Sequence, residues 1–341
     1  MKPTRCRLLL AGLAFAAVGL AALTSCSSDS SSDSSSGGKD LKPFTVVLDW
    51  TPNTNHAGMY LAREQGWYED AGLDVEFVEP GDSGSLALVA AGKGDVAVSV
   101  SEELIPARVQ GLPVRSIAAV VQHNTSSLLS LEEDGITEPA DLAGKTYGGF
   151  GGQLERALLD KLVTCGGGDP ESLKTVDVGE ADYRIGLERN QYDVVWIFDG
   201  WDGIRLQQEG VKTNTIPFID HADCIPDWYT PILATSTEVE DDRPEDLTAF
   251  LAATVKGYQE AMADPAAASD ALLSANDDLD PELVKASAEF LSTRYAEDPG
   301  AWGQQDQNTW DDFHAFLADS GLIEQPIDVD EAWTNEYLPT P

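Results

Sequence analysis

The chain has 341 residues, with 59 Asp or Glu against 21 Lys or Arg, for a formal net charge of −38 at pH 7. Such an excess of negative charge argues against nucleic acid and anionic membrane surfaces as partners. The four histidines, at positions 56, 123, 221 and 314, are scattered. None lies at ligand spacing beside a cysteine, so we expect no metal and no cofactor.

The first 26 residues have the pattern of a secretory signal. Lys2, Arg5 and Arg7 precede an uncharged apolar run at 8–23, which is shorter than the ~20 residues of a membrane-spanning helix. Small residues then lead to Cys26, which resembles the cysteine of the bacterial lipobox. We therefore expect residues 1–25 to be a signal peptide and Cys26 to be lipidated. The protein would then be a lipoprotein on the outer face of the cytoplasmic membrane.

Residues 26–40 are expected to form a tether, because 27–38 contain only Ser, Asp and Gly and cannot bury apolar surface. Two cysteines, Cys165 and Cys224, remain in the part that should fold. In an oxidising exterior they can form a disulfide or stay reduced, and the sequence leaves the choice open.

Strands and helices alternate from residue 42 onward. We expect strands at residues 44–48, 75–78, 95–100, 145–148 and 194–198. We expect helices at residues 55–70, 83–91, 153–163, 244–263 and 308–317, with others opening at Asp169-Pro170 and Asp280-Pro281.

This alternation predicts an α/β fold with two lobes, each a mainly parallel sheet flanked by helices. The length also favours two lobes, because ~300 residues exceed what one hydrophobic core usually serves. We expect lobe 1 at residues 41–131 plus 232–341 and lobe 2 at 132–231, with crossing strands at 127–131 and 231–235. The ligand cleft would lie between the lobes.

Three polar or aromatic segments follow expected strands, where open α/β sheets bind ligands. The first carries Asp49, Trp50, Asn53 and His56 on a strand-to-helix turn. It combines a carboxylate, an aromatic face and hydrogen-bonding groups that can bind a ligand. The alternative is a capped helix start, with Asn53 or Asn55 as the cap and Trp50 in the core.

The second segment is a glycine-rich turn containing Phe150, Gly151 and Gly152. Glycines let backbone N–H groups approach a ligand at the start of a helix. A plain tight turn is equally consistent, because the segment lacks the Lys-Ser/Thr of a P-loop and the dinucleotide fingerprint.

The third segment ends a strand with Trp196, Asp199 and Trp201. Asp199 can accept hydrogen bonds from an amino group. Further candidates are Ser99, Ser101, Trp228 and Tyr229. Aromatic faces with carboxylates favour a flat, nitrogen-rich ligand, although a Trp is more often part of a core.

The sequences LDWTPNTNHAGMYLAREQGWYEDAGLDVEF (48–77) and GITEPADLAGKTYG (135–148) resemble ABC-transporter solute-binding proteins of the family shared with thiamine-pyrimidine synthase. The resemblance runs from about residue 44 to the end and favours the branch that binds aminopyrimidine precursors of thiamine. It implies the two-lobed type II periplasmic-binding-protein fold.

By this resemblance, Asp49 and Trp50 match the Asn-Trp pair at the pyrimidine. Gly151 and Gly152 match the glycine loop that holds phosphate in the synthase. Asp199 matches a Glu that grips the heterocycle. The places of the synthase's cofactor-binding Lys and its substrate His carry Ser99 and Glu103, and its cysteine-rich motif is absent. The resemblance therefore implies binding without catalysis.

The sequence thus predicts a non-enzymatic solute-binding lipoprotein of an ABC importer, acting as a monomer with a permease and an ATPase. Its ligand would be a formylaminopyrimidine or hydroxymethylpyrimidine. Riboflavin or another flat heterocycle is the nearest alternative, and a sulfonate follows. A synthase-like enzyme and a purely structural lipoprotein are the remaining alternatives.

Overall fold

A computed structural model describes residues 40–178 and 182–340 of the chain. The expected signal peptide, the lipidated Cys26 and the tether up to residue 39 lie outside the described residues. In the part that is described, no helix is both long and apolar enough to cross a membrane.

The first sheet has five strands in the order β2-β1-β3-β10-β4. These strands are β1 (Lys42–Val47), β2 (Leu73–Val78), β3 (Val96–Ser99), β4 (Val114–Ala119) and β10 (Ile232–Ser236). Strand β1 pairs in parallel with β2 and β3, whereas β10 lies antiparallel between β3 and β4. The sheet is therefore mixed, with four strands running in one direction and β10 reversed.

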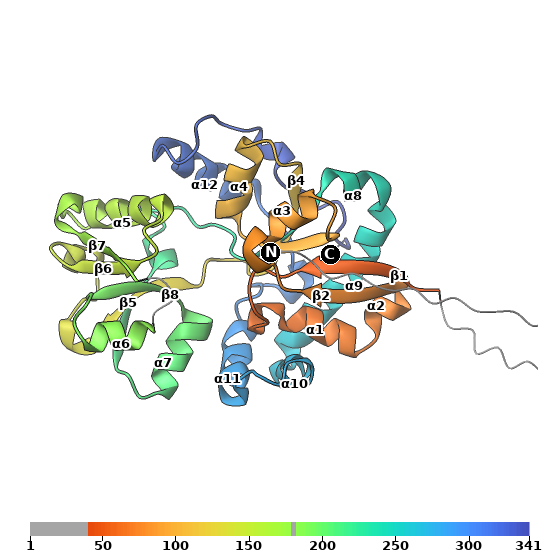
Figure 1. Ribbon diagram of the computed structural model, residues 1–341, viewed down its shortest axis with the longest axis horizontal. Coiled ribbons are helices and arrows are strands. Elements are labelled where there is room, and N and C mark those ends of the chain that lie inside the picture. Colours follow the sequence, from red (N-terminus) through yellow and green to blue (C-terminus); the bar gives the residue numbers. More distant parts are fainter. Residues whose placement is uncertain (1–39, 179–181, 341) are drawn as a thin grey trace, which may run out of the picture. The chain divides into compact units, whose positions relative to one another are not determined.

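The second sheet also has five strands, in the order β7-β6-β8-β5-β9. They are β5 (Ser126–Leu131), β6 (Thr146–Gly149), β7 (Lys174–Asp177), β8 (Val194–Phe198) and β9 (Thr213–Pro217). Here β5 is the reversed strand, because it pairs antiparallel with both β8 and β9. Two mixed, mainly co-directional sheets flanked by helices confirm the predicted α/β class (Figure 1).

The helices follow the predicted order, but one expected helix is broken, another is reduced to a single turn, and several helices were not expected. The helices are α1 (Ala57–Glu64), α2 (Trp67–Asp70), α3 (Ser85–Ala90), α4 (Ser101–Val109), α5 (Gln153–Cys165), α6 (Tyr183–Glu188), α7 (Ile204–Gln208), α8 (Thr237–Asp242), α9 (Pro244–Ala263), α10 (Pro265–Ala275), α11 (Pro281–Ser292) and α12 (Gln307–Asp319). The single helix expected at 55–70 is broken because Gly66 adopts a φ of 71°. The helix expected from Asp169-Pro170 is only a short 3-10 turn at Pro170–Ser172.

The two faces of the second sheet are covered by different helices. Figure 1 shows α5 on one face and α6 and α7 on the other. Val194 packs with Leu158 of α5, while Val195 and Ile197 pack with Leu187 and Leu206 of α6 and α7. Successive side chains of β8 therefore point to opposite faces of the sheet, and the same alternation holds at the end of the strand.

The segments that connect the two sheets are residues 120–125 and 218–231. The crossing strands expected at 127–131 and 231–235 are instead the reversed strands β5 and β10, each inside a sheet. His123 Nδ1 lies 2.6 Å from Asp227 Oδ2, and the Asn124 N–H donates to Asp227 Oδ1 at 2.9 Å. These contacts join the two connecting segments.

Cys165 and Cys224 form a disulfide with a Cα–Cα distance of 6.0 Å, which ties α5 to the second segment. The exact lobe boundaries stay a prediction.

Candidate functional site

The loop after β1 holds one carboxylate in a defined position. The Asn53 N–H donates to His56 Nδ1 at 3.2 Å, so His56 carries its proton on Nε2 and donates it to Asp49 Oδ1 at 2.8 Å. The His56 ring is fully buried, whereas the Asp49 side chain is 25% exposed. Asp49 Oδ2 has no hydrogen-bond partner among the described residues. This arrangement leaves one oriented acceptor at the end of a strand.

Trp50, beside this carboxylate, is 58% exposed, so the alternative is wrong in placing Trp50 in the core. It is confirmed in the cap, because the Asn53 side chain accepts the Asn55 N–H at 2.9 Å at the start of the short turn Thr54–His56. Phe150 and Phe198 are likewise large apolar side chains with exposed rings, at 60% and 40%. The three lie at the ends of β1, β6 and β8. Aromatic faces in water at the carboxyl ends of strands are typical of ligand contacts.

The end of β3 places a second carboxylate near Asp49. Ser99 Oγ donates to Glu103 Oε2 at 3.4 Å. Burial raises the pKa of the Glu103 carboxyl, and the nearby negative charge of Asp49 raises it further. Ser101 is buried, and its N–H donates to the Tyr229 carbonyl oxygen at 3.0 Å. This edge of the first sheet is therefore acidic and suits a ligand that donates hydrogen bonds.

The glycine-rich turn is occupied by a side chain of its own helix. Glu155 accepts hydrogen bonds from the N–H groups of Phe150 (3.2 Å) and Gly152 (2.8 Å) and from the Tyr147 hydroxyl (2.8 Å). Gly151 has a φ of 73°, a conformation that favours glycine. Because a carboxylate already fills these donors, an anionic group would have to displace Glu155. Sequence reasoning missed Glu155, although a Glu three residues into a helix is a capping signal.

Beyond β8 the chain forms a single π-helical turn at Asp199–Gly203, a feature frequently found at functional sites. Burial raises the pKa of the Asp202 carboxyl, while the neighbouring Arg205 lowers it. Burial raises the pKa of the Tyr183 hydroxyl to about 12, and the charges of Asp202 and Glu155 contribute to the rise.

Several predicted aromatic residues lie in the core. Trp228 is 1% exposed and stacks on Phe313 of α12 at 5.3 Å, and Trp196 meets it edge-on at 6.1 Å. Tyr229 is also buried, and its hydroxyl accepts the Asp306 N–H at 2.8 Å. Trp201 is partly buried against Tyr60, Leu272 and Val284. In this conformation Trp228 and Tyr229 offer no face to a ligand.

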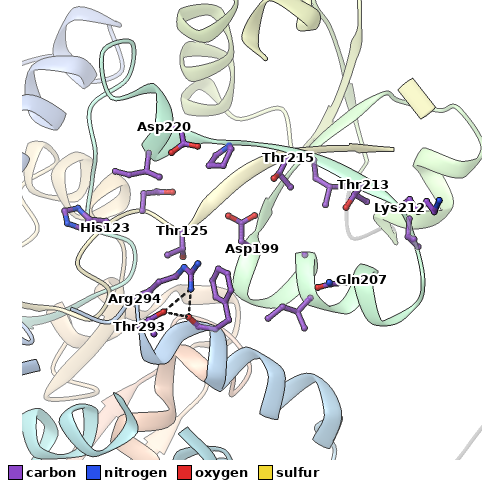
Figure 2. Close-up of a pocket in the computed structure, with 18 of the residues that line it drawn as sticks. His123, Thr125, Asp199, Gln207, Lys212, Thr213, Thr215, Asp220, Thr293 and Arg294 are labelled. Atoms are coloured by element: carbon purple, nitrogen blue, oxygen red, sulfur yellow. Dashed lines mark hydrogen bonds between the residues drawn. The ribbon is translucent and has the colours of Figure 1, made fainter. Parts of the chain in front are cut away.

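Asp199 lines a cavity of about 910 Å³ beside the connecting segments (Figure 2). Ser127 Oγ donates to Asp199 Oδ2 at 2.8 Å. Burial raises the pKa of the Asp199 carboxyl to about 6, against the lowering effects of Ser127 and Arg294. Asp49, Trp50 and the glycine turn do not line this cavity. The π-helical turn that begins at Asp199 nevertheless meets the segment after β1, because the Ser287 hydroxyl bonds to both Thr54 Oγ1 and the Gly200 carbonyl oxygen.

Comparison with known proteins gives a consistent result. Over 321 residues the chain is 29% identical to a formylaminopyrimidine-binding protein of Halalkalibacterium halodurans, covering 92% of this chain and 94% of that one. It is 24% identical to a 4-amino-5-hydroxymethyl-2-methylpyrimidine phosphate synthase of Legionella pneumophila, covering 86% and 92%.

Among solved structures, the periplasmic aliphatic sulphonate binding protein SsuA of Escherichia coli superimposes with a TM-score of 0.68 at 15% identity, covering 85% of this chain and 91% of that one. At this identity the likeness shows a shared fold, that of periplasmic binding proteins. The family model described as "NMT1/THI5 like" matches residues 53–268. The chain therefore belongs to the NMT1/THI5-like family.

Proposed function

We propose that this protein is an extracytoplasmic solute-binding protein that captures an aminopyrimidine precursor of thiamine, of the formylaminopyrimidine or hydroxymethylpyrimidine type. The observation that carries the proposal is the pair of adjacent groups at the end of β1. Trp50 is 58% exposed, and Asp49 beside it keeps Oδ2 without a partner among the described residues. A flat ring can stack on Trp50 while its exocyclic amino group donates to Asp49.

The acidity of the surrounding strand ends supports the same ligand class. Glu103 lies near Asp49, and Glu155 fills the N–H donors of the glycine turn. A sulfonate or phosphate placed here would meet carboxylates where it needs donors, so an anion is disfavoured. An uncharged or cationic heterocycle that donates N–H groups is not repelled by these carboxylates and can form hydrogen bonds with them. Riboflavin is the nearest rival, because the same aromatic faces would serve a larger ring.

Binding rather than catalysis is supported by the end of β3. The places that match the Lys and His of the synthase carry Ser99 and Glu103, which share a hydrogen bond of 3.4 Å. Neither side chain can form the bond that a Lys forms with a pyridoxal cofactor. The chain thus resembles the synthase in outline while it lacks two groups that the reaction needs.

The proposed cellular role follows from the N-terminus and the family fold. Cys26 would anchor the protein to the outer face of the membrane, and lobes at 41–131 with 232–341 and at 132–231 would close on the ligand. The closed form would then meet the permease of an ABC importer. Replacing Cys26 with Ser should move the protein from the membrane fraction to the soluble fraction. A Cys26→Ser protein that remains in the membrane fraction would contradict the anchor.

Isothermal titration calorimetry of the protein from residue 27 onward tests the ligand. We expect binding of one of the two pyrimidines and none of an alkanesulfonate. Trp50→Ala should weaken binding by roughly fivefold to 150-fold, from a stacking contribution of about 1–3 kcal/mol. The matched control is Ile185→Ala, which truncates another exposed apolar side chain. Tight riboflavin binding without pyrimidine binding would overturn the assignment.

A further inference from the structure

The cavity beside the connecting segments holds two opposite charges that do not meet. Arg294 and Asp199 both line it, and Figure 2 shows the two side chains projecting into the same space. The positive charge of Arg294 lowers the pKa of Asp199, so the two groups sense each other. No ion pair joins them within 4.0 Å. Charges held apart across one cavity suit a molecule that carries both signs.

Arg294 is positioned by its own helix end and not by a carboxylate. Its guanidinium stacks on the Phe290 ring at 3.6 Å, and NH1 donates to the Phe290 carbonyl (2.7 Å) and to Thr293 Oγ1 (3.2 Å). The NH2 and Nε groups have no hydrogen-bond partner among the described residues. A chain this acidic pairs most of its other described arginines with carboxylates: Arg108, Arg115, Arg156, Arg184, Arg205 and Arg243. Arg294 is an exposed residue, so its free donor fork is open to water and can bind an anionic group.

Asp199 forms the complementary end of the cavity. Ser127 holds its Oδ2 at 2.8 Å, and Oδ1 has no hydrogen-bond partner in the described part of the chain. Asp220 also lines the cavity and adds negative charge near Asp199. By contrast, the lining carboxylates Glu132 and Glu297 lie near Lys212 and His123. The uncompensated negative charge thus gathers around Asp199, where an amino group would be stabilised.

The rest of the wall is roomy and mixes apolar with polar side chains. Its apolar members include Leu129, Ile204, Val211, Pro217, Ile219 and Phe290, and its polar members include Thr125, Gln207, Lys212, Thr213 and Thr215. A volume of about 910 Å³ is at the upper end of the range for small-molecule sites. An amino group and a carboxylate would fill little of it, so a large side chain has space there and can contact the apolar part of the wall.

We propose that this cavity is a second binding site, separate from the strand-end site of Asp49 and Trp50, for a molecule of amino-acid type with a large apolar side chain. Arg294 binds the carboxylate through NH2 and Nε, Asp199 accepts from the amino group, and the apolar wall takes the side chain. Because His123 and Asn124 of the first connecting segment also line the cavity, occupancy would stabilise one arrangement of the two sheets.

The test uses phenylalanine, leucine and tryptophan as probes in isothermal titration calorimetry of the protein from residue 27 onward. We expect at least one of them to bind wild type and Trp50→Ala equally well. Arg294→Gln and Asp199→Asn should each raise the Kd at least tenfold. Arg294→Lys, which keeps the charge and loses the fork, should give an intermediate Kd.

Controls separate a lost site from a lost fold. Lys285→Gln and Asp278→Asn remove exposed charges of the same sign elsewhere and should leave the Kd unchanged. Melting temperatures and far-UV circular dichroism report the fold of each variant.

Three results would overturn the proposal. One is that none of the probes binds wild type, and another is that Trp50→Ala abolishes their binding. The third is that phenethylamine or phenylpropionate, which lack one charge each, bind as tightly as phenylalanine. Pyrimidine binding is measured in separate titrations, so the proposed pyrimidine site and the proposed cavity site can each be refuted independently.

Discussion

The hydrogen bond from His56 to Asp49 gives a direct test of how the strand-end acceptor is held. His56→Leu replaces a fully buried ring with an apolar side chain and leaves both the Asn53 N–H and Asp49 Oδ1 without this partner. One lost bond is to a backbone N–H and the other is to a carboxylate. From about 1 kcal/mol for the first and about 1.5–3 for the second, the free energy of unfolding should fall by roughly 2–4 kcal/mol.

Ligand affinity should fall less than stability in the same variant. Asp49 remains present but is free to rotate, and ordering one side chain costs about 0.5–1.5 kcal/mol. The pyrimidine Kd should therefore rise by roughly twofold to twelvefold. Asp49→Asn keeps an acceptor for His56, so it should change stability little and affinity more.

The assay combines urea unfolding with calorimetric titration of His56→Leu, Asp49→Ala and the double variant. A double-mutant cycle isolates the coupling between the two side chains, which we expect at about 1–3 kcal/mol. Additive effects within about 0.5 kcal/mol would refute the hydrogen bond as a stabilising contact. An unchanged pyrimidine Kd in His56→Leu would refute the orienting role of His56.

Three further predictions concern stability. Reducing the Cys165–Cys224 disulfide, which spans a sequence separation of 59, should lower the free energy of unfolding by about 2–4 kcal/mol; equal urea midpoints with and without dithiothreitol would contradict this. Burial raises the pKa of the Glu102 carboxyl to about 8, so between about pH 4.5 and pH 8 the folded state binds a proton that the unfolded state has lost, and stability should fall as pH rises. Glu102→Gln should flatten this part of the curve of unfolding free energy against pH, and a variant curve parallel to that of wild type would count against it. A Cβ added at Gly58 would lie 2.4 Å from Tyr258 Cγ, so Gly58→Ala should cost roughly 1–3 kcal/mol by urea unfolding, and an unchanged midpoint would show that the helices separate freely.

Local patterns were enough to predict much of the fold. The strands β1, β6 and β8 and the helices α5, α9 and α12 occur close to the expected residues, because short apolar runs, helical spacing and capping residues act over a few positions. The Asp49-Trp50 pair was also found in this way, since a polar turn directly after a strand is visible in the sequence. Its place at the carboxyl end of a largely co-directional sheet follows from the alternation of strands and helices.

The tertiary structure decided which of these groups are available to a ligand. Trp228 and Tyr229 are buried because α12, some 80 residues later, packs Phe313 and Trp310 against them, and no local pattern reports a contact so distant in sequence. Asp199 is likewise held by a distant residue, because its Oδ2 accepts a hydrogen bond from Ser127 of β5, 72 positions earlier in the chain. The sequence by itself therefore determined the class of fold and one strand-end pair, because these depend on nearby residues. Only the tertiary structure showed which residues share the Asp199 cavity, because its lining comes from β5, β9, α7 and α11, which are far apart in the chain.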